Sequence, residues 1–332
     1  MKNSELVAYC KLFKKSLSEI EEFLSYGKSI NTGGSLSFEF KELVSKIEER
    51  LSKKDIHLIT YWDEEYPEVL RNISNPPVFL FVKGEVDCLA YNLFAVVGTR
   101  KMSNYGKQVT EQFVKELTKY FVIVSGMAYG IDSIAHMTAL NSAGRTIAVL
   151  GCGVDVVYPK SNELLYKEII KKGCVMSEYL PWERPQKYTF VARNRIISGL
   201  SQGVLVTEAG MDSGALITAK FGLEQGKDIF AVPGDIYKPS SEGTNYLIQN
   251  GAFLVTNPYQ ILEYYGFKEH KKLVELSEEE KLIINILSTE HTVEEILEKT
   301  SKNFSEIMVL LTILELKGLI YRTESGMYAR AI

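Results

Sequence analysis

Short runs of apolar, mostly β-branched residues recur between Leu93 and Pro233, and most of them precede a stretch with helical spacing of its apolar positions. Uninterrupted apolar runs of this length are typical of strands that are buried on both faces of a parallel sheet. Strands that alternate with helices of about 10–15 residues indicate βαβ units. We therefore predict an α/β domain whose strands lie at Phe94–Val97, Val122–Ser125, Thr146–Leu150, Gly203–Thr207 and Ile229–Val232.

Helical spacing predicts the segments that connect these strands. They lie at Tyr105–Tyr120, Gly130–Ala143, Asn162–Lys172, Arg193–Leu200 and Ser213–Gly226, with a last strand at Ala252–Thr256 and a helix from Pro258. Upstream, apolar runs separated by prolines predict two further strands, at His57–Tyr61 and Pro76–Val82, because proline favours turns and strand starts. The predicted α/β domain covers residues 56–267.

Two smaller domains flank this core in the predicted organisation. Residues 1–55 show a mixed-charge helical pattern, broken around Gly27–Gly34, and predict a small helical domain. Beyond a linker at residues 268–275, residues 276–332 predict three short helices and a hairpin around Thr323–Gly326, which is a winged-helix pattern. This last domain is acidic, so we expect a protein-interaction or spacer role rather than recognition of a duplex groove.

Bulk composition narrows the class of protein. With 332 residues, 45% of them apolar, the chain can fill one large core and one or two small ones. No apolar run approaches the roughly 20 residues of a membrane span, and the N-terminus lacks a signal-peptide pattern, so we expect a cytoplasmic protein with no membrane partner. The four cysteines have neither metal-ligand nor disulfide spacing, which fits a reducing cytoplasm.

Charge is distributed unevenly along the chain. The formal net charge is −4, yet residues 93–202 carry 14 Lys and Arg against 8 Asp and Glu, a local net charge of +6. The other three segments, 1–92, 203–259 and 260–332, are each acidic. A local basic face, and not the average charge, decides whether a protein binds a polyanion. The basic segment is also the one that contains the first three strands of the predicted parallel sheet.

Glycines follow the predicted strands where a ligand would approach. In open parallel sheets, ligands bind at the carboxyl ends of the strands, where glycine allows close backbone approach and helix N-termini favour anions. Gly98, Thr99 and Arg100 follow one strand, and Ser125 and Gly126 end the next. The planar guanidinium of Arg100 can bind two phosphate oxygens at once. This pattern predicts a phosphate-binding pocket.

Cations in two further segments alternate with aromatic and amide side chains. This combination suits a single nucleic-acid strand, since charge follows its backbone while a ring stacks on a splayed base. The alternative for each of these residues is structural, as a ring in the core or a solvated loop charge. The residues concerned are Lys160, Asn162, Lys187, Phe190, Arg193 and Asn194.

Signatures of catalysis are incomplete. Gly106-Lys107 lacks both the spacing of a P-loop and the Ser or Thr that follows its lysine. Asp132 and His136 would share a helix face and could orient a base toward Ser125, but no Gly-x-Ser-x-Gly elbow is present. A packed, hydrogen-bonded histidine is the preferred interpretation. We therefore predict no catalytic residue, no metal site and no cofactor.

A series of short motifs runs through the α/β domain. They are Val96–Arg100, Ser125–Asp132, Ala148–Gly151, Tyr158–Pro159 with Asn162, Ser177–Tyr179, Phe190–Ser201, Glu208–Ala219 and Phe230–Gly234. The whole series resembles the DNA-processing protein A (DprA/Smf) family, over roughly residues 61–255. The resemblance implies an extended Rossmann-like core between a small helical, SAM-like N-terminal domain and a C-terminal winged-helix domain.

The resemblance also implies a function without catalysis. Members of the family are homodimeric cytoplasmic proteins that bind single-stranded DNA, protect incoming DNA in natural transformation and load the recombinase RecA onto it. Tyr129 stands where family members usually carry arginine. Carried onto this sequence, the DNA-binding residues would be Gly98, Thr99, Arg100, Ser125, Gly126, Lys160, Asn162, Lys187, Phe190, Arg193 and Asn194.

A nucleotide-binding Rossmann enzyme or sensor, similar to phosphoribohydrolases, is the alternative. In that hypothesis Glu208 is a catalytic acid and Arg193–Arg195 hold a 5′-phosphate. Otherwise Arg195, Glu208, Ser213 and Gly214 are structural or pocket residues, and Arg195 and Glu208 form a buried ion pair. Affinity for an oligonucleotide that falls steeply with salt would favour the DNA-binding hypothesis, whereas base release from a mononucleotide would favour the enzyme.

Overall fold

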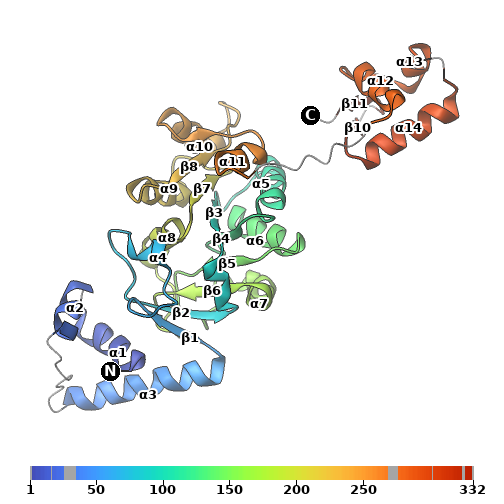
Figure 1. The fold of residues 1–332 in the computed structure, drawn as a ribbon. Coiled ribbons are helices and arrows are strands. Elements are labelled where there is room, and N and C mark those ends of the chain that lie inside the picture. The colour runs from blue at the N-terminus through green and yellow to red at the C-terminus, as the bar shows by residue number, and fades with distance from the viewer. Residues whose placement is uncertain are drawn as a thin grey trace. The chain divides into compact units, whose positions relative to one another are not determined.

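The structure is a computed structural model that describes residues 2–15, 17–25, 35–267, 276–300, 302–323 and 326–330. The chain folds into two compact units, Met1–Glu269 and His270–Ile332 (Figure 1). The first unit contains the predicted α/β domain, and the second contains the predicted C-terminal domain. The predicted linker at residues 268–275 and the predicted helix break around Gly27–Gly34 lie outside the described residues.

Nine strands form one sheet in the first unit. They are β1 (His57–Thr60), β2 (Phe79–Gly84), β3 (Leu93–Val97), β4 (Val122–Ser125), β5 (Thr146–Val149), β6 (Cys174–Ser177), β7 (Gly203–Val206), β8 (Asp228–Ala231) and β9 (Phe253–Leu254). Their order is β1-β2-β6-β5-β4-β3-β7-β8-β9. The strands of the run β6-β5-β4-β3-β7-β8-β9 are all parallel to one another, whereas β2 runs antiparallel to both β1 and β6. The chain builds outward from β3 to β6 and then returns to place β7 beside β3, so the order reverses between β3 and β7.

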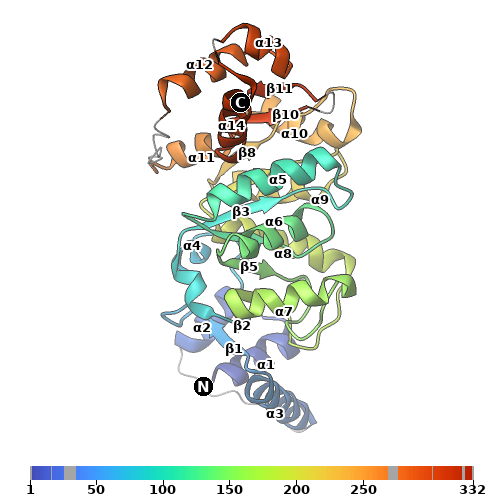
Figure 2. The ribbon, with the colours of Figure 1, turned by 90° about the vertical axis from the view of Figure 1, so that its right-hand side faces the viewer.

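Helices cover both faces of this sheet (Figures 1 and 2). One face carries α5 (Asn104–Leu117), α6 (Ile131–Asn141), α7 (Glu163–Lys172) and α11 (Pro258–Tyr264). The other face carries α4 (Glu68–Arg71), α8 (Lys187–Leu200) and α9 (Gly214–Glu224), with α10 (Pro239–Gln249) packed against β8. Two short 3-10 helices, η1 (Val86–Ala90) and η2 (Lys160–Asn162), complete the connections. The predicted α/β class and Rossmann-like sheet are confirmed.

Alternate residues of the central strands enter two different cores. In β3, Leu93, Ala95 and Val97 face the hydrophobic cluster formed with α8 and α9, whereas Phe94 and Val96 face the cluster formed with α5 and α6. Strand side chains alternate with this period of two, so a strand covered on both faces has no polar position. This arrangement explains the uninterrupted apolar runs of the sequence.

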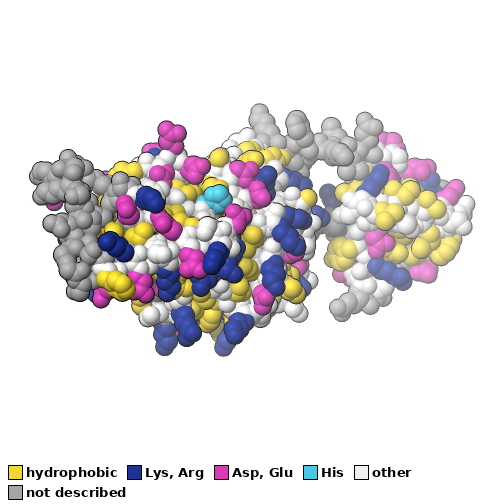
Figure 3. Space-filling model, turned by 90° about the horizontal axis from the view of Figure 1, so that it is seen from below, with side chains coloured by type: hydrophobic (Ala, Val, Ile, Leu, Met, Phe, Trp, Pro, Cys, Tyr) yellow, Lys and Arg dark blue, Asp and Glu magenta, His cyan; other side chains and the backbone are white. Residues whose placement is uncertain are grey.

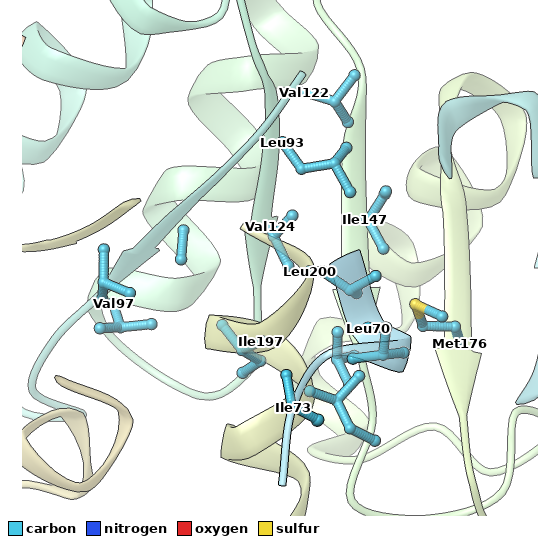
Figure 4. Close-up of a cluster of buried hydrophobic side chains, with 14 of the residues drawn as sticks. Leu70, Ile73, Leu93, Val97, Val122, Val124, Ile147, Met176, Ile197 and Leu200 are labelled. Atoms are coloured by element: carbon cyan, nitrogen blue, oxygen red, sulfur yellow. The ribbon is translucent and has the colours of Figure 1, made fainter. Parts of the chain in front are cut away.

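The α8 face of the sheet is closed by the segment that precedes β2. Figure 4 shows Leu70 and Ile73 from this segment near Ile197 and Leu200 of α8, in the same cluster as strand residues such as Ile147. All of these side chains are at most 6% exposed. Helix α8, whose first turns reach the carboxyl ends of the strands, is therefore held firmly on the sheet.

The N-terminal helices share a core with the sheet. They are α1 (Asn3–Phe13), α2 (Leu17–Ser25) and α3 (Ser35–Lys54). Leu6, Ile20 and Ile47 from these helices lie in the same hydrophobic cluster as Phe79 and Val175 from the sheet. The helices consequently belong to the same compact unit as the α/β domain. The domain boundary expected at residue 55 stays a prediction.

The second unit has its own hydrophobic core. It consists of α12 (Glu278–Ile286), α13 (Val293–Glu298), α14 (Phe304–Leu316), β10 (Ile320–Arg322) and β11 (Tyr328–Arg330) around Ile283, Ile307 and Leu311. Each helix begins with a reciprocal capping box, for example Ser277 with Glu280. Three helices and a hairpin are the elements that the sequence predicts here, while the winged-helix arrangement stays a prediction. Residues 324 and 325 of the predicted hairpin turn lie outside the described residues.

Strand β6 and helices α4 and α10 are absent from the sequence-based expectation, and helix α8 begins earlier than expected. Helix α8 begins at Lys187, six residues before the predicted start at Arg193, because Gln186 and Thr189 form a capping box that the spacing of apolar positions does not reveal. Helix α10 was not predicted, because its sequence contains Pro, Ser, Gly and Asn, which favour turns. Its proline occupies the first helical position, where no hydrogen-bond donor is needed.

Candidate nucleic-acid interface

A cavity of about 640 Å³ lies at the carboxyl ends of β3 and β7, where the strand order reverses. Reversal points of this kind are the ligand sites of open α/β sheets. The walls come from residues 97–101 after β3, residues 210–215 after β7, and the first two turns of α8. Ala128 and Asp132 line the side toward β4, and Pro239 and Glu242 line the side toward α10.

The loop after β3 is fixed by backbone hydrogen bonds. The Thr99 N–H donates to the Glu208 carbonyl oxygen (2.8 Å), and the Thr99 carbonyl oxygen accepts from the Ile131 N–H (3.2 Å). Gly98 is required because a Cβ there would lie 2.6 Å from Cγ1 of Ile131. Arg100, the next residue of the loop, is exposed and lines the cavity. The strand end thus directs a cation to the cavity, as the sequence predicts.

Arg193 lies in the floor of the cavity and is only 4% exposed. Its guanidinium donates to the carbonyl oxygens of Gly126 (2.6 Å) and Val149, and lies 4.0 Å from the Asp132 carboxylate. Burial lowers the pKa of Arg193, but a guanidinium keeps its charge in proteins. Gly126 has no side chain because a methyl group would overlap this guanidinium. Arg193 therefore fixes the ends of β4 and β5 rather than extending toward solvent.

Two other predicted contact residues are also engaged inside the protein. The Ser125 hydroxyl is fully buried and donates to the Val96 carbonyl oxygen at 2.7 Å. The Asn162 amide donates to the Met127 carbonyl oxygen (3.0 Å) and to the Ser133 hydroxyl (2.8 Å). Asn162 thereby ties the loop after β5 to the loop after β4. Both side chains shape the interface from within.

The N-terminus of α9 closes the far side of the cavity. The Ser213 hydroxyl caps this helix by accepting from the Ala215 N–H (3.3 Å). Gly214, the first helical residue, is exposed, and its carbonyl oxygen accepts from the Asn194 amide (3.3 Å). Asn194 in turn accepts from Nε of Arg193 (3.0 Å). These bonds join α8 to α9, and the positive end of the α9 dipole faces the cavity.

Four exposed cations follow β3, begin η2 or begin α8, and two of them, Arg100 and Lys101, line the cavity. None of Arg100, Lys101, Lys160 and Lys187 forms an ion pair with another residue in the described part of the chain. Lys101 was not singled out from the sequence, although it follows Arg100 directly and lines the cavity. Lys187 occupies the first position of α8, and Lys160 begins η2. Exposed cations without carboxylate partners are available to phosphate groups.

Phe190 lies three residues after Lys187 in α8, lines the cavity and is partly buried. Its ring packs on the backbone of Gly151, where an added Cβ would lie 2.8 Å from Cδ1 of the ring. The Arg100 guanidinium lies 5.5 Å from the ring centroid, and the Tyr158 ring lies 5.2 Å away with a tilt of 38°. Phe190 is thus neither a core residue nor a free ring. It forms the base of a small aromatic and cationic cluster.

Charge around the cavity is mixed. Asp132, Asp212 and Glu242 line it together with the cations. Burial raises the pKa of Asp132, and the neighbouring Arg193 charge and Ala128 N–H oppose this rise. On the face drawn in Figure 3, acidic and basic side chains are interspersed over much of the first unit. The unpaired cations are therefore a local feature and not part of a uniformly basic surface.

The residues of the alternative enzyme site do not come together. Arg195 forms a bidentate ion pair with Glu178, with both N···O distances at 2.6 Å, and donates to the Asn75 carbonyl oxygen (2.9 Å). Glu208 accepts from the Ser103 N–H (2.8 Å) at the start of α5. The predicted pairing of Arg195 with Glu208 is therefore wrong. The Glu208 carboxylate stabilises a helix N-terminus instead.

His136 is a packed structural residue. Its Nε2 accepts from the Met127 N–H (3.3 Å), and its Nδ1 lies 2.6 Å from the Thr146 hydroxyl. Burial, together with the Arg193 charge, lowers the pKa of His136 to about 3. The neutral imidazole thus satisfies groups after the end of β4 and at the start of β5, and the Ser125 hydroxyl bonds elsewhere. The interpretation as a hydrogen-bonded core histidine is confirmed.

The described residues contain no group of three or more His, Cys, Asp or Glu side chains that could hold a metal ion. None of the helices in this part of the chain is at once long enough and apolar enough to cross a membrane.

The doubly wound sheet, with a cavity at its reversal point and unpaired cations beside it, defines a Rossmann-type α/β binding protein. The family model described as "DNA recombination-mediator protein A" matches residues 57–266. The chain belongs to this family, also known as DprA/Smf, whose model describes recombination mediators. The resemblance seen in the sequence motifs is thus confirmed.

Individual relatives agree with this assignment. DNA processing protein DprA of Streptococcus pneumoniae is 48% identical over 205 residues, which span 62% of this chain and 73% of that protein. Its X-ray structure has a TM-score of 0.68 and covers 81% of this chain and 99% of its own. DNA processing protein A of Helicobacter pylori, whose structure is described for its single-stranded DNA binding mode, is 32% identical in sequence. That structure has a TM-score of 0.59, and the match covers 64% of this chain and 97% of that one.

Proposed function

We propose that this protein binds single-stranded DNA along the cavity edge and acts in the cytoplasm without catalysing a reaction. The observation that carries the proposal is that Arg100, Lys160 and Lys187 are exposed and form no ion pair among the described residues, while Arg100 also lies against the Phe190 ring in the cavity at the sheet's reversal point. The single-stranded DNA binding named for the Helicobacter pylori relative supports it. Cations and rings contact phosphates and base faces, which all sequences share, so we expect little sequence preference.

In this proposal, the exposed residues contact DNA and the buried ones position them. Arg100, Lys160 and Lys187 bind successive phosphates, and Gly98 and Thr99 let the backbone approach. Neutralising about four phosphates of a single strand gives a slope of log affinity against log salt of about −3. Ser125, Gly126, Asn162, Arg193 and Asn194 hold the loops in place through the hydrogen bonds described above.

A homodimer forms part of the proposal. The edge strand β9 is short and exposes Phe253 (44%) and Leu254 (48%), next to the exposed Tyr264 of α11. An apolar sheet edge of this kind is suited to pairing with a second copy. Two linked interfaces on one strand would raise affinity through effective concentration. Leu254→Glu should then convert a dimer to a monomer in light scattering.

The physiological role extends the binding activity. We propose that the bound strand is protected during natural transformation and is passed to the recombinase RecA, as the family resemblance implies. The acidic second unit is available for protein contacts rather than for DNA. A strand-exchange assay with RecA and single-stranded DNA tests this role separately from binding.

The test of DNA binding uses two triple variants with the same change in charge. One replaces Arg100, Lys160 and Lys187 by glutamate. The control replaces Lys167, Lys171 and Lys220, which are exposed and lie beside helical glutamates. Fluorescence anisotropy with labelled oligothymidine should show a loss of binding in the first variant and only a small change in the control. Equal affinities of the two variants would contradict the proposal.

A further inference from the structure

We infer that helix α14 of the second unit binds an amphipathic helix of another protein, one whose apolar residues are bordered by lysine and arginine. The binding surface is the row formed by Val309, Ile313 and Leu316 on the outer face of α14, and we call this row the α14 stripe. The proposed DNA interface lies wholly in the first unit. The inference therefore does not depend on DNA binding.

The inner face of α14 already has its partners. Ile307, Leu311 and Leu314 are fully buried in the hydrophobic core of the second unit. Through this face α14 packs against α12, α13 and β10 (Figure 1). The core of the unit is thus formed without the residues on the opposite face of the helix.

The outer face of the same helix is also apolar. Val309, Ile313 and Leu316 are 57%, 37% and 84% exposed. Their spacing of i, i+4 and i+7 places them in one row along the helix. Single exposed apolar residues are common on protein surfaces, but a row of three neighbours indicates an interaction site.

The geometry of the α14 stripe fits a helical partner. Helices that bind through one face use apolar residues at i, i+3 or i+4, and i+7, which is the spacing found here. From Val309 to Leu316 the stripe is about 10 Å long, since each helical residue adds about 1.5 Å. A second helix that packs its own apolar ridge along α14 covers two turns of this kind.

The charges on α14 specify the chemistry of that partner. The helix contains no lysine or arginine, and its two charged residues are Glu306 and Glu315, both exposed. Glu306 accepts a hydrogen bond from the Asn303 N–H (3.0 Å), and neither carboxylate forms an ion pair with a described residue. Carboxylates without cationic partners beside an apolar row complement lysine or arginine on the bound helix.

The nearest cations of the unit are already engaged. Lys281, Lys302 and Lys317 form ion pairs with Glu278, Glu279 and Glu280 of α12, at N···O distances of 2.5 to 2.7 Å. These lysines therefore do not neutralise the carboxylates of α14. The negative charge beside the α14 stripe is left for a partner.

Two other occupants are disfavoured by the same charges. In DNA-binding helix-turn-helix domains the second helix of the motif enters the major groove, but α14 carries no cation to offset phosphate. A second copy of the chain would bring two acidic units together, because residues 276–332 contain 6 Lys and Arg against 10 Asp and Glu. Like charges across an interface oppose association.

The first experiment measures binding of a model helix to the full-length protein. The probe is a labelled peptide of leucine and lysine, with leucines at i, i+3, i+4 and i+7. Fluorescence anisotropy should show binding to the wild type, and affinity lower by about tenfold or more when Val309, Ile313 and Leu316 are all replaced by glutamine. Glutamine is a good helix former, and the replaced side chains lie outside the core, so the triple variant should keep the wild-type resistance to proteolysis.

A matched control replaces two exposed apolar residues on other elements of the same unit. Leu282 of α12 is 46% exposed and Tyr321 of β10 is 49% exposed. With both residues changed to glutamine, the affinity for the leucine and lysine peptide should change by less than about twofold.

The second experiment tests the sign of the charge. A peptide with glutamate in place of every lysine should not bind the wild-type protein. Glu306→Gln combined with Glu315→Gln should weaken binding of the lysine peptide by about two- to fivefold and reduce its salt dependence. Glutamine at position 306 can still serve in the capping box of α14, so the helix start is preserved.

Three results would overturn the inference. The first is equal affinity of the wild type and the triple variant for the lysine peptide, or equal binding of the lysine and glutamate peptides by the wild type. The second is a lower molar mass of the triple variant in light scattering, which would assign the α14 stripe to a second copy. The third is a loss of affinity for duplex DNA or oligothymidine in the triple variant, which would assign the stripe to nucleic acid.

Discussion

The guanidinium of Arg193 and the carbonyl oxygen of Gly126 are joined by a hydrogen bond of 2.6 Å, although the two residues lie on α8 and at the end of β4. The same guanidinium bonds to the last residue of β5. Two loops of the interface consequently depend on one buried side chain. A substitution that fills the space beside the Arg193 guanidinium, or one that removes its charge, should lower both the stability of the protein and its affinity for DNA.

Gly126→Ala should be strongly destabilising. The added methyl group overlaps the guanidinium and forces it away from its carbonyl partners, which leaves a buried charged group with unmade bonds. We expect the free energy of unfolding to fall by about 2–3 kcal/mol. Urea denaturation can be followed by tryptophan fluorescence, because Trp62 and Trp182 both lie in the first unit. Gly214→Ala, where the Cβ meets open space, is the control, and it should change stability by less than about 0.5 kcal/mol.

Lys187→Ala should reduce the salt dependence of DNA binding. Each phosphate contact of a single strand contributes about 0.7 to the slope of log affinity against log salt, so the slope should become less steep by about 0.7. Anisotropy titrations between low and moderate salt measure it. Lys167→Ala, on α7 in an exposed pair with Glu163, should leave the slope unchanged. An equal change in both variants would show that net charge, and not the position of Lys187, determines the slope.

Glu178→Ala tests whether Arg195 has a structural role. The carboxylate forms both bonds of the bidentate pair, and the side chains of Arg195 and Glu178 are only 11% and 17% exposed. Loss of one partner should lower the free energy of unfolding by about 3 kcal/mol, because Arg195 would be left unpaired. Removing the exposed carboxylate of Glu168 should have almost no effect. The affinity for oligothymidine should stay at the wild-type value in both the Glu178 and the Glu168 variant. A loss of affinity in Glu178→Ala alone would indicate that Arg195 contributes to DNA binding.

His136 should make the first unit sensitive to acid. Its pKa is about 3 in the folded protein and near 6.5 when unfolded, so unfolding takes up a proton in between. The stability that the neutral ring contributes is complete above pH 6.5 and is lost as pH falls toward 3, at up to about 1.4 kcal/mol per pH unit. Asp132, whose pKa is raised, opposes part of this loss.

The measurement compares wild type with His136→Gln, which cannot titrate. Free energies of unfolding from urea denaturation are determined at several pH values between 7 and 4. The difference between the two proteins should shrink steadily below pH 6.5. If the free energies of unfolding of wild type and His136→Gln fall by the same amount as the pH is lowered, protonation of other groups accounts for the acid sensitivity.

Local sequence patterns predict the sheet well because each central strand is buried on both faces. All five residues from Leu93 to Val97 are buried, so all five must be apolar. Glycines such as Gly98 were placed correctly because close approach of loops at strand ends excludes a side chain. Helix α10 was missed because its stability comes from contacts with β8 and not from its own polar sequence.

The division of the site into exposed and buried residues could not be predicted. Arg100 and Arg193 look alike in sequence, as single cations near a strand end or helix start, but only the fold determines that one faces solvent and the other bonds to Gly126. The partner of Arg195 is equally non-local, since Glu178 follows a different strand. The contact of Tyr158 with Phe190 likewise exists only in three dimensions.

Helix α8 carries Phe190 at the surface and Arg193 three residues later in the interior. A pull on a bound strand would therefore reach the centre of the sheet through less than one helical turn, and the loops after β4 and β5 would shift with it as one body. Under the proposed function, tension along a bound strand would thus be resisted by the hydrogen bonds that Arg193 forms inside the domain.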